Sequence, residues 1–496
     1  MSGLAGEKSR QDGSDGGLMT QELNERYRAC RERLESRGQG HLLRWWDELD
    51  AEARRHLLGE IESIPWGVID PLLESHVRAR PVEVPMDDLA PPATWRREPA
   101  PEQEPLYRAA ADRGAQLIAD GKVGAFTVAG GQATRLGFDG PKGAMTITPV
   151  REKSLFQLFA ETIAAVQARY GVRIPWYIMT SPANHRQTLG FLSDHEYFGL
   201  PKQDVMLFNQ RMLPSCDFQG RMLLSDRSHL ALAPDGHGGA LKSLSLSGAL
   251  RDMQERGVEI VSFFQVDNPL VAPFDPLFIG LHRLTGSELS TKVARKASDF
   301  ERVGNVCLAG GKVVVVEYSN FPAELATVRQ PDGRRRFDCG NLAIHLLERS
   351  FIERIVGREF ELPFHRSEKS VTWLDEHGRE RSSAPETPNA VKLETYVFDA
   401  LPLASNPLLL EVERGEEFSP VKNAAGNDSV ATAVRDQVRR AARWLEAAGA
   451  TIPRTSAGEP AVTLEIAPAY ALTQDEFLRR GPHPMALQSG EAVYLS

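Results

Sequence analysis

From Tyr107 onward the sequence alternates between helical stretches and short apolar runs. The helical stretches are 107–120, 154–170, 241–254 and 276–284, and the apolar runs are 123–128, 176–179, 259–266 and 312–317. This alternation is typical of βαβ units, in which crossover helices join parallel strands. The sequence therefore predicts an α/β fold with a central, mainly parallel, Rossmann-like sheet. In such a sheet, ligands bind at the carboxyl ends of the strands.

The chain is too long for one hydrophobic core, because 496 residues exceed what a single core usually holds. Residues 1–17 are rich in Gly, Ser and charge and lack the apolar centre of a signal peptide, so we expect a disordered tail there. We expect a helical N-terminal domain ending in a Pro-rich linker at 18–104, a catalytic domain at 105–400, and a small C-terminal domain containing strands at 401–496.

The N-terminal helical segment carries two neighbouring tryptophans, Trp45 and Trp46, within an apolar cluster at helical spacing. This spacing is explained by core packing, which we prefer to a role in stacking on a ligand. Asp50 follows the cluster and is expected to cap the next helix, because its carboxylate can accept from the first N–H groups of a helix.

Composition narrows the classes of partner. The net charge of −9 argues against a nucleic-acid-binding protein, which would need a basic face, although a local cluster of cations can still bind phosphates. No apolar run approaches the roughly 20 residues that cross a bilayer. The four cysteines are scattered without a C-x-x-C pair, which argues against structural zinc and favours reduced thiols in the cytoplasm. The oligomeric state is left open.

A pair of glycines follows the first apolar run. Val128 ends that run, and Gly130 and Gly131 let the backbone turn with its N–H groups pointing outward, an arrangement that suits an anion. Arg135 and Lys142 add two cations close to the turn, suited to a triphosphate. The spacing is neither a Rossmann fingerprint nor a P-loop. For the glycine pair alone, a plain strand-to-helix turn is the alternative.

An acidic residue, Asp267, closes the apolar run at 259–266. A carboxylate at the tip of a central strand can hold Mg²⁺ against phosphates, because magnesium takes one or two carboxylates and fills its other positions with phosphate oxygens and water. The alternative is that Asp267 caps the following turn.

Other polar residues fall at strand ends or in loops. Glu317, Tyr318 and Asn341 offer a carboxylate, a phenol and an amide that could bind sugar hydroxyls. His237 lies in a glycine-rich loop before a helical stretch, where it could contact a ligand or face water. Lys369 and Lys422 taken singly would be solvated surface lysines.

Several separated stretches match one protein family in order. They are GGQATRLG (130–137) with PKG (141–143), NQRMLP (209–214), APDGHGG (233–239), VDN (266–268), VEYS (316–319), GN (340–341), VKLETYVFD (391–399) and EFSPVKN (417–423). On these motifs the chain resembles the eukaryotic-type UDP-N-acetylglucosamine pyrophosphorylases, within the wider UDP-sugar pyrophosphorylase group. The resemblance runs from about residue 38 to about residue 480.

The resemblance implies a nucleotide-diphospho-sugar transferase architecture and a reaction in which UTP and N-acetylglucosamine 1-phosphate give UDP-N-acetylglucosamine and pyrophosphate. It implies small-molecule substrates and a Mg²⁺ cofactor, with Mn²⁺ as an alternative. By position, the nucleotide would be bound by Val128, Ala129, Gly130, Gly131, Lys142, Gln210, Gly236, Asp267 and Lys369. The sugar phosphate would be bound by His237, Glu317, Tyr318, Asn341 and Lys422. Arg135, Lys142 and Lys422 would be catalytic, and Asp267 would bind the metal.

Two positions depart from the family pattern. Ala133 stands where these enzymes usually have glycine, which is tolerable if φ is negative there. His237 stands where the acetylglucosamine enzymes carry asparagine, and a Gly-His-Gly loop is more similar to the UDP-glucose and broad UDP-sugar relatives. A uridylyltransferase for glucose or galactose 1-phosphate, or a broad UDP-sugar pyrophosphorylase, is therefore the alternative enzyme. A non-catalytic sensor of UDP-sugars is the alternative from another class, and it would be expected to have lost the cations that this chain retains.

Overall fold

The computed structural model describes residues 14–80, 88–357, 362–384, 386–483 and 486–496. The chain divides into two compact units. The first unit consists of Met1–Glu83, Met212–Gly236 and Pro363–Thr395, and the second of Val84–Arg211, His237–Leu362 and Tyr396–Ser496. This division differs from the domain boundaries expected from the sequence, which stay a prediction.

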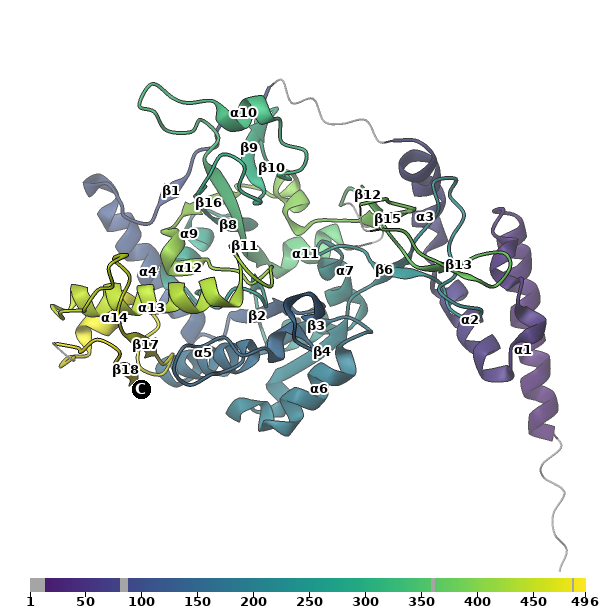
Figure 1. The fold of residues 1–496 in the computed structure, drawn as a ribbon, viewed down its shortest axis with the longest axis horizontal. Coiled ribbons are helices and arrows are strands. Elements are labelled where there is room, and N and C mark those ends of the chain that lie inside the picture. The colour runs from purple at the N-terminus through teal and green to yellow at the C-terminus, as the bar shows by residue number, and fades with distance from the viewer. Residues whose placement is uncertain (1–13, 81–87, 358–361, 385, 484–485) are drawn as a thin grey trace, which may run out of the picture. The chain divides into compact units, whose positions relative to one another are not determined.

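The second unit is built on a ten-stranded sheet (Figure 1). Its strands run in the order β1 (Trp95–Arg96), β16 (Leu408–Glu411), β8 (Leu289–Arg295), β11 (Cys339–Glu348), β7 (Ile260–Gln265), β2 (Val123–Val128), β3 (Trp176–Thr180) and β4 (Val205–Asn209), with β9 (Asn305–Ala309) and β10 (Lys312–Val316) off this path. Neighbours along the path are parallel, except that β11 is antiparallel to both β7 and β8. The predicted central, mainly parallel sheet is confirmed, and the Pro-rich segment contributes β1 to its edge.

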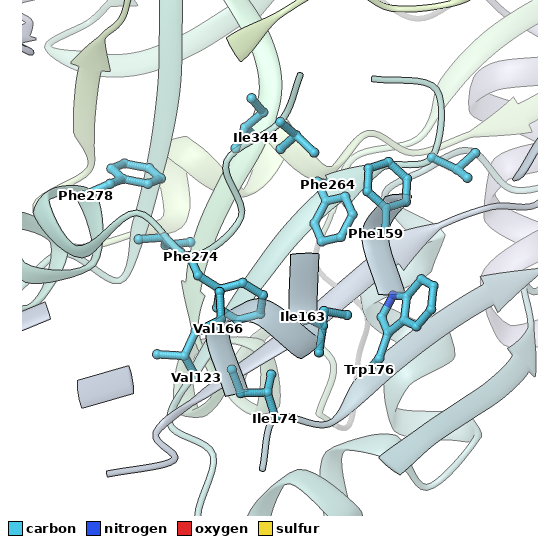
Figure 2. Close-up of a cluster of buried hydrophobic side chains, with 14 of the residues drawn as sticks. Val123, Phe159, Ile163, Val166, Ile174, Trp176, Phe264, Phe274, Phe278 and Ile344 are labelled. Atoms are coloured by element: carbon cyan, nitrogen blue, oxygen red, sulfur yellow. The ribbon is translucent and has the colours of Figure 1, made fainter. Parts of the chain in front are cut away.

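Helices cover both faces of this sheet. One face packs against α4 (Glu104–Ala119), α5 (Leu155–Tyr170) and α9 (Pro276–Leu284), and the other against α7 (Gly239–Leu246), α8 (Ala249–Glu255) and α11 (Arg349–Ile355). The stretch 241–254, expected as one helix, is two helices, because Gly248 has φ +83° between them. Figure 2 shows the core on the α5 side, where Phe159, Ile163 and Val166 of α5 lie against residues from the strands.

Two of the helices on the first face cross with their backbones in contact. A Cβ at Gly114 of α4 would lie 1.8 Å from the Pro276 carbonyl oxygen, and a Cβ at Gly280 of α9 would lie 1.6 Å from the Ala110 carbonyl oxygen. Only glycine permits this approach. Because α4 leads into β2 and α9 follows β7, the crossing joins the helices next to the two central strands.

The C-terminal part of the second unit contains the strands predicted there. After α12 (Arg414–Glu417) come α13 (Val430–Ala447), β17 (Thr463–Ile466), α14 (Gln474–Arg479) and β18 (Ala492–Leu495), and β17 pairs with β18 in parallel. Glu465 of β17 accepts hydrogen bonds from the N–H groups of Val150 and Arg151 (2.8 and 2.7 Å). These bonds join the C-terminal part to the loop before α5.

The first unit combines helices with short antiparallel strand pairs. It contains α1 (Ser14–Glu35), α2 (Ala51–Ser63) and α3 (Trp66–Leu72), with the pairs β5 (Met212–Pro214) and β6 (Leu232–Pro234), β12 (His365–Lys369) and β15 (Ala390–Glu394), and β13 (Trp373–Leu374) and β14 (Glu380–Arg381). The three segments are joined by contacts between them. Buried Gln39 bonds the Gly220 carbonyl and the Met222 N–H, and Cys216 pairs with Val391.

Local predictions for this unit are mostly confirmed. The Asp50 carboxylate caps α2 by accepting from the N–H groups of Glu52 and Ala53. Trp46 is buried as expected, whereas Trp45 is half-buried beneath the Arg227 guanidinium. Helix α1 begins at Ser14, inside the segment expected to be a tail, and residues 1–13 of that segment lie outside the described residues. Within the described ranges, none of the helices is both long and apolar enough to span a membrane.

Candidate active site

The glycine turn lies at the centre of the sheet, where β2 is flanked by β3 and β7. After Val128, the Ala129 N–H still bonds the Met179 carbonyl of β3 (2.7 Å), and the chain then leaves the sheet through Gly130 and Gly131. Ala133 is fully buried with φ −103°. Its methyl group is therefore accommodated, as expected for a negative φ.

The carbonyl groups of the turn accept hydrogen bonds from other residues of the second unit. The Asn184 side chain donates to the carbonyl oxygens of Ala129 and Gly131 (2.9 and 3.2 Å). The Lys142 N–H also donates to the Gly131 carbonyl (3.2 Å), which ties the segment carrying Lys142 to the turn. The turn is thus fixed on its carbonyl side.

Gln210 packs directly on the turn. It follows β4, and its N–H bonds the Thr180 carbonyl (2.7 Å). A Cβ at Gly130 would lie 2.9 Å from Gln210 Oε1, whereas a Cβ at Gly131 would meet no protein atom within 4 Å. One glycine therefore faces the Gln210 amide, and the other faces open space.

Lys142 and Asp267 come together at the strand tips. Lys142 Nζ lies 3.7 Å from Asp267 Oδ2 and donates to the Val421 carbonyl (3.1 Å). The side chains of Lys142 and Asp267 are only 18% and 11% exposed. The Val421 N–H in turn bonds the Asp267 carbonyl (2.9 Å), so three segments distant in the sequence converge here. Arg135 is exposed, and no ion pair joins it to another described residue.

A cavity with a volume of about 200 Å³ opens beside this pair. Six of the predicted residues line it: His237, Asp267, Glu317, Tyr318, Asn341 and Lys422. Asn341 reaches the cavity because β11 is antiparallel to β7, which places the start of β11 beside the end of β7, where Asp267 follows.

His237 lines this cavity and lies against a stacked pair of aromatic rings, Tyr396 and Phe398. The centroids of Tyr396 and Phe398 are 5.2 and 5.4 Å from the imidazole centroid. The Val397 N–H donates to His237 Nδ1 (3.1 Å). Because Nδ1 is the acceptor, a neutral ring carries its hydrogen on Nε2.

Asn341 and Lys422 are held in different ways. Asn341 Oδ1 accepts from Thr291 Oγ1 (3.2 Å) and from the Ala343 N–H (3.1 Å), which fixes the amide. Lys422 has an exposed side chain whose Nζ lies 5.9 Å from the centre of the Phe418 ring. Its N–H bonds the Asp428 carbonyl (2.6 Å). Burial raises the pKa of the Asp428 carboxyl, and the nearby positive charge of Lys422 opposes this shift.

Two predicted nucleotide residues, Gly236 and Lys369, belong to the first unit. Gly236 has φ +80°, and a Cβ there would lie 2.2 Å from the Thr395 carbonyl oxygen, so only glycine fits. Lys369 ends β12 with an exposed side chain. Their role in nucleotide binding stays a prediction.

Several residues around the site were not expected from the sequence. Arg302, Phe398 and Phe418 line the cavity, and Asn184 holds the turn. Phe418 lies in the EFSPVKN motif (417–423), where an aromatic residue close to Lys422 is visible in the sequence. Arg302 and Asn184 carry no comparable sequence signal, because each acts only through its place in the fold.

The metal site predicted at Asp267 would rest on one protein carboxylate. The described residues contain no group of three or more His, Cys, Asp or Glu side chains that could hold a metal ion. A single buried carboxylate beside a lysine fits an ion that takes most of its ligands from phosphate oxygens and water, as Mg²⁺ does.

A glycine turn, a Lys142–Asp267 pair and a cavity at the carboxyl ends of a doubly covered sheet are typical of an α/β nucleotide-binding enzyme. The structure is similar to the uridine diphosphate N-acetylglucosamine pyrophosphorylase of Trypanosoma brucei in complex with an inhibitor, with a TM-score of 0.76 and 25% identity over 95% of this chain and 98% of that chain.

Sequence relatives agree with the structural likeness. The chain is 39% identical to the human UDP-N-acetylhexosamine pyrophosphorylase-like protein 1 over 88% of this chain and 91% of the human protein. It is 33% identical to UDP-N-acetylglucosamine diphosphorylase 2 of Arabidopsis thaliana over 92% of each protein. The family model described as UTP–glucose-1-phosphate uridylyltransferase matches residues 86–435. The chain belongs to this uridylyltransferase family, and the predicted family is confirmed.

Proposed function

We propose that this enzyme converts UTP and N-acetylglucosamine 1-phosphate to UDP-N-acetylglucosamine and pyrophosphate. The observation that carries the proposal is the cavity beside Lys142, which gathers six predicted residues from five separate motifs. The names of the human, plant and trypanosome relatives support the N-acetylated sugar.

The chemistry needs neither a protein nucleophile nor a general base. An oxygen of the sugar phosphate forms a bond to the α-phosphorus of UTP while the bond from that phosphorus to the bridging oxygen breaks, and pyrophosphate leaves with the electron pair. The phosphate monoester is already ionised at neutral pH, so it can attack directly. The site must align two anions that repel each other and neutralise charge on the leaving group.

The residues of this chain divide that work by position. We assign the UTP phosphates to Lys142, Arg135 and the turn at Gly130 and Gly131, and the sugar phosphate to Lys422. His237, Glu317 and Asn341 would bind the sugar hydroxyls. In the first unit, Gly236 and Lys369 are assigned to the uracil and to UTP, by position in the family motifs alone.

We assign the metal position to Asp267, which would hold Mg²⁺, with Mn²⁺ as an alternative. When bound, the ion supplies positive charge to the phosphates. Adding a chelator should abolish turnover, and adding Mg²⁺ back should restore it. Full turnover in the presence of excess chelator would contradict this assignment.

A second candidate activity, on glucose or galactose 1-phosphate, is favoured by His237. In this structure the imidazole packs against the stacked rings of Tyr396 and Phe398 and lines the cavity. The test is a panel of sugar 1-phosphates with release of pyrophosphate as the readout. We expect the N-acetylated sugar to give the highest kcat/KM, and a higher value for glucose 1-phosphate would reverse the order of the two candidates.

The same panel should be run on His237→Asn. If His237 limits acceptance of the acetyl group, this substitution should shift preference further toward N-acetylglucosamine 1-phosphate. An unchanged ranking of substrates would exclude His237 as the residue that sets the preference.

We infer that the enzyme acts in the cytoplasm. All four cysteines are free thiols, which supports a reducing compartment. Fractionation of cells that express the protein would test the inference, and recovery in a secreted or organellar fraction would contradict it.

A further inference from the structure

The buried side-chain amide of Asn184 hydrogen-bonds the carbonyl groups of the glycine turn at 129–131. Asn184 precedes α6 (His185–Asp194) and is 0% exposed. Its Nδ2 donates to the carbonyls of Ala129 and Gly131, and its Oδ1 accepts from the Ser181 N–H (2.9 Å) and from Ser181 Oγ (3.1 Å). Every hydrogen-bonding group of this side chain is therefore used inside the protein.

Asn184 uses its side chain for these bonds and does not cap the helix that follows it. Asparagine at the start of a helix usually caps the first N–H groups, which is worth about 1 kcal/mol. Asn184 occupies that position before α6 but makes no side-chain cap. Its amide donors bond two carbonyls more than 50 residues earlier in the chain instead. A local rule broken in favour of a distant contact is expected at a functional site.

The two bonds also set the direction of two N–H groups. A trans peptide is planar, so its carbonyl and its N–H point in opposite directions. Because the Ala129 and Gly131 carbonyls point at Asn184, the N–H groups of Gly130 and Gln132 point away from it. Within the part of the chain that the structure describes, neither of these N–H groups has a protein acceptor. Two outward N–H groups on a turn next to Lys142 form an anion-binding nest.

We propose that Asn184 is a positioning residue that aims the Gly130 and Gln132 N–H groups at the phosphates of UTP. The inference rests on the proposed function for the identity of the nucleotide. It adds a residue that makes no contact with substrate and acts on nucleotide binding through the backbone.

Asn184→Asp tests the proposal with a side chain of the same shape. A carboxylate cannot donate, and it repels the two carbonyl oxygens, so the turn should lose its orientation. The KM for UTP should rise about tenfold or more, as expected for lost hydrogen bonds to an anion, while the KM for the sugar 1-phosphate changes less than about twofold. Asn184→Ala, which removes the donors without adding charge, should move the KM for UTP in the same direction by a smaller factor.

Gln187→Glu is the matched control for charge. Gln187 lies on the first turn of α6 and is exposed, and among the described residues its side chain hydrogen-bonds the side chain of Gln132 (3.4 Å). The Gln187→Glu substitution adds the same negative charge close to Asn184 but does not contact the carbonyl groups of the turn. The KM for UTP should therefore stay close to that of the unsubstituted enzyme.

Calorimetric titration with UTP and Mg²⁺, run beside the kinetics, separates this inference from the proposed function. If the unsubstituted enzyme binds UTP but turns over no sugar phosphate, the proposed reaction fails, and weaker UTP binding by Asn184→Asp still supports the role of Asn184. Unchanged UTP affinity in both Asn184 variants would overturn the inference. So would an equal rise in both KM values together with a lower Tm, because that pattern indicates a purely structural role.

Discussion

Lys142 and Lys422 are both assigned to phosphates, but the protein holds them differently. Lys142 is mostly buried, lies 3.7 Å from Asp267 and donates to the Val421 carbonyl. The exposed side chain of Lys422 forms no ion pair with another described residue. On the nucleotide side, therefore, the cation belongs to a network that exists without ligand. At Lys422, by contrast, the described residues near the ammonium group are the Phe418 ring and the Asp428 carboxyl. Loss of Lys142 should affect both turnover and folding, whereas loss of Lys422 should affect turnover alone.

The largest effect is expected for Lys142→Ala. It removes a contact to the charge that develops on the leaving group, worth about 2–4 kcal/mol, so kcat should fall by about a hundredfold or more. It also leaves the buried Asp267 carboxylate without its cation, so Tm should fall. Steady-state kinetics and thermal unfolding measure the two effects. Near-normal turnover would remove Lys142 from the catalytic set.

Lys422→Ala should reduce turnover by a similar factor, about a hundredfold or more, because the sugar phosphate loses its cation. Its Tm should match that of the unsubstituted protein, since the side chain is exposed. The exposed Lys202 of the same unit supplies a control, and Lys202→Ala should leave both quantities unchanged. A large fall in the Tm of Lys422→Ala would break the comparison between the two lysines.

Gly131→Ala tests whether the nucleotide side is shaped for a ligand. The new methyl group meets no protein atom within 4 Å, so the fold should tolerate it. If phosphate lies against the turn, the methyl group should raise the KM for UTP by roughly tenfold, because one displaced phosphate contact costs about 1–3 kcal/mol. Gly190→Ala in α6 also projects into open space and is the matched control. Equal KM values for the two variants would place UTP elsewhere.

The smallest effect concerns Asp428, beside Lys422. Burial raises the pKa of its carboxyl above the ordinary 3.8, so ionisation of this group costs stability in the folded state. That cost is absent below the unfolded pKa and appears as pH rises through the folded pKa. Asp428→Asn should therefore have a Tm closer to that of the unsubstituted protein near pH 3 than at pH 7, where the variant should be the more stable. A Tm difference that does not change with pH would contradict the raised pKa of the Asp428 carboxyl.

Local patterns predicted much of the fold. The runs that became β2, β3 and β7 are short, apolar and separated by helical stretches, and Asp50 stands directly before an apolar helical repeat. Such signals are carried by neighbouring residues. By contrast, nothing in the sequence near 212–236 or 363–395 indicates that these segments join the N-terminal helices, because that union depends on distant pairs such as Cys216 with Val391.

The same limit applies to the site. Glycines and cations next to a strand end are visible in the sequence, and the six residues of the cavity were found through five separate motifs. The bond from Lys142 to the Val421 carbonyl spans 279 residues and uses a backbone atom that every residue type offers. The role of Asn184 could not be predicted, because an asparagine before a helix predicts a helix cap, whereas its side chain bonds the carbonyl groups of the glycine turn.

The crossing of α4 and α9 limits how this enzyme can be redesigned. Libraries that aim to admit bulkier sugars can vary the loops around the cavity, because those residues lie outside the close contact between Gly114 and Gly280. A larger side chain at either glycine would push apart the two helices that adjoin the strands carrying the glycine turn and Asp267. Engineers should therefore treat positions 114 and 280 as invariant, although neither glycine is an assigned substrate contact.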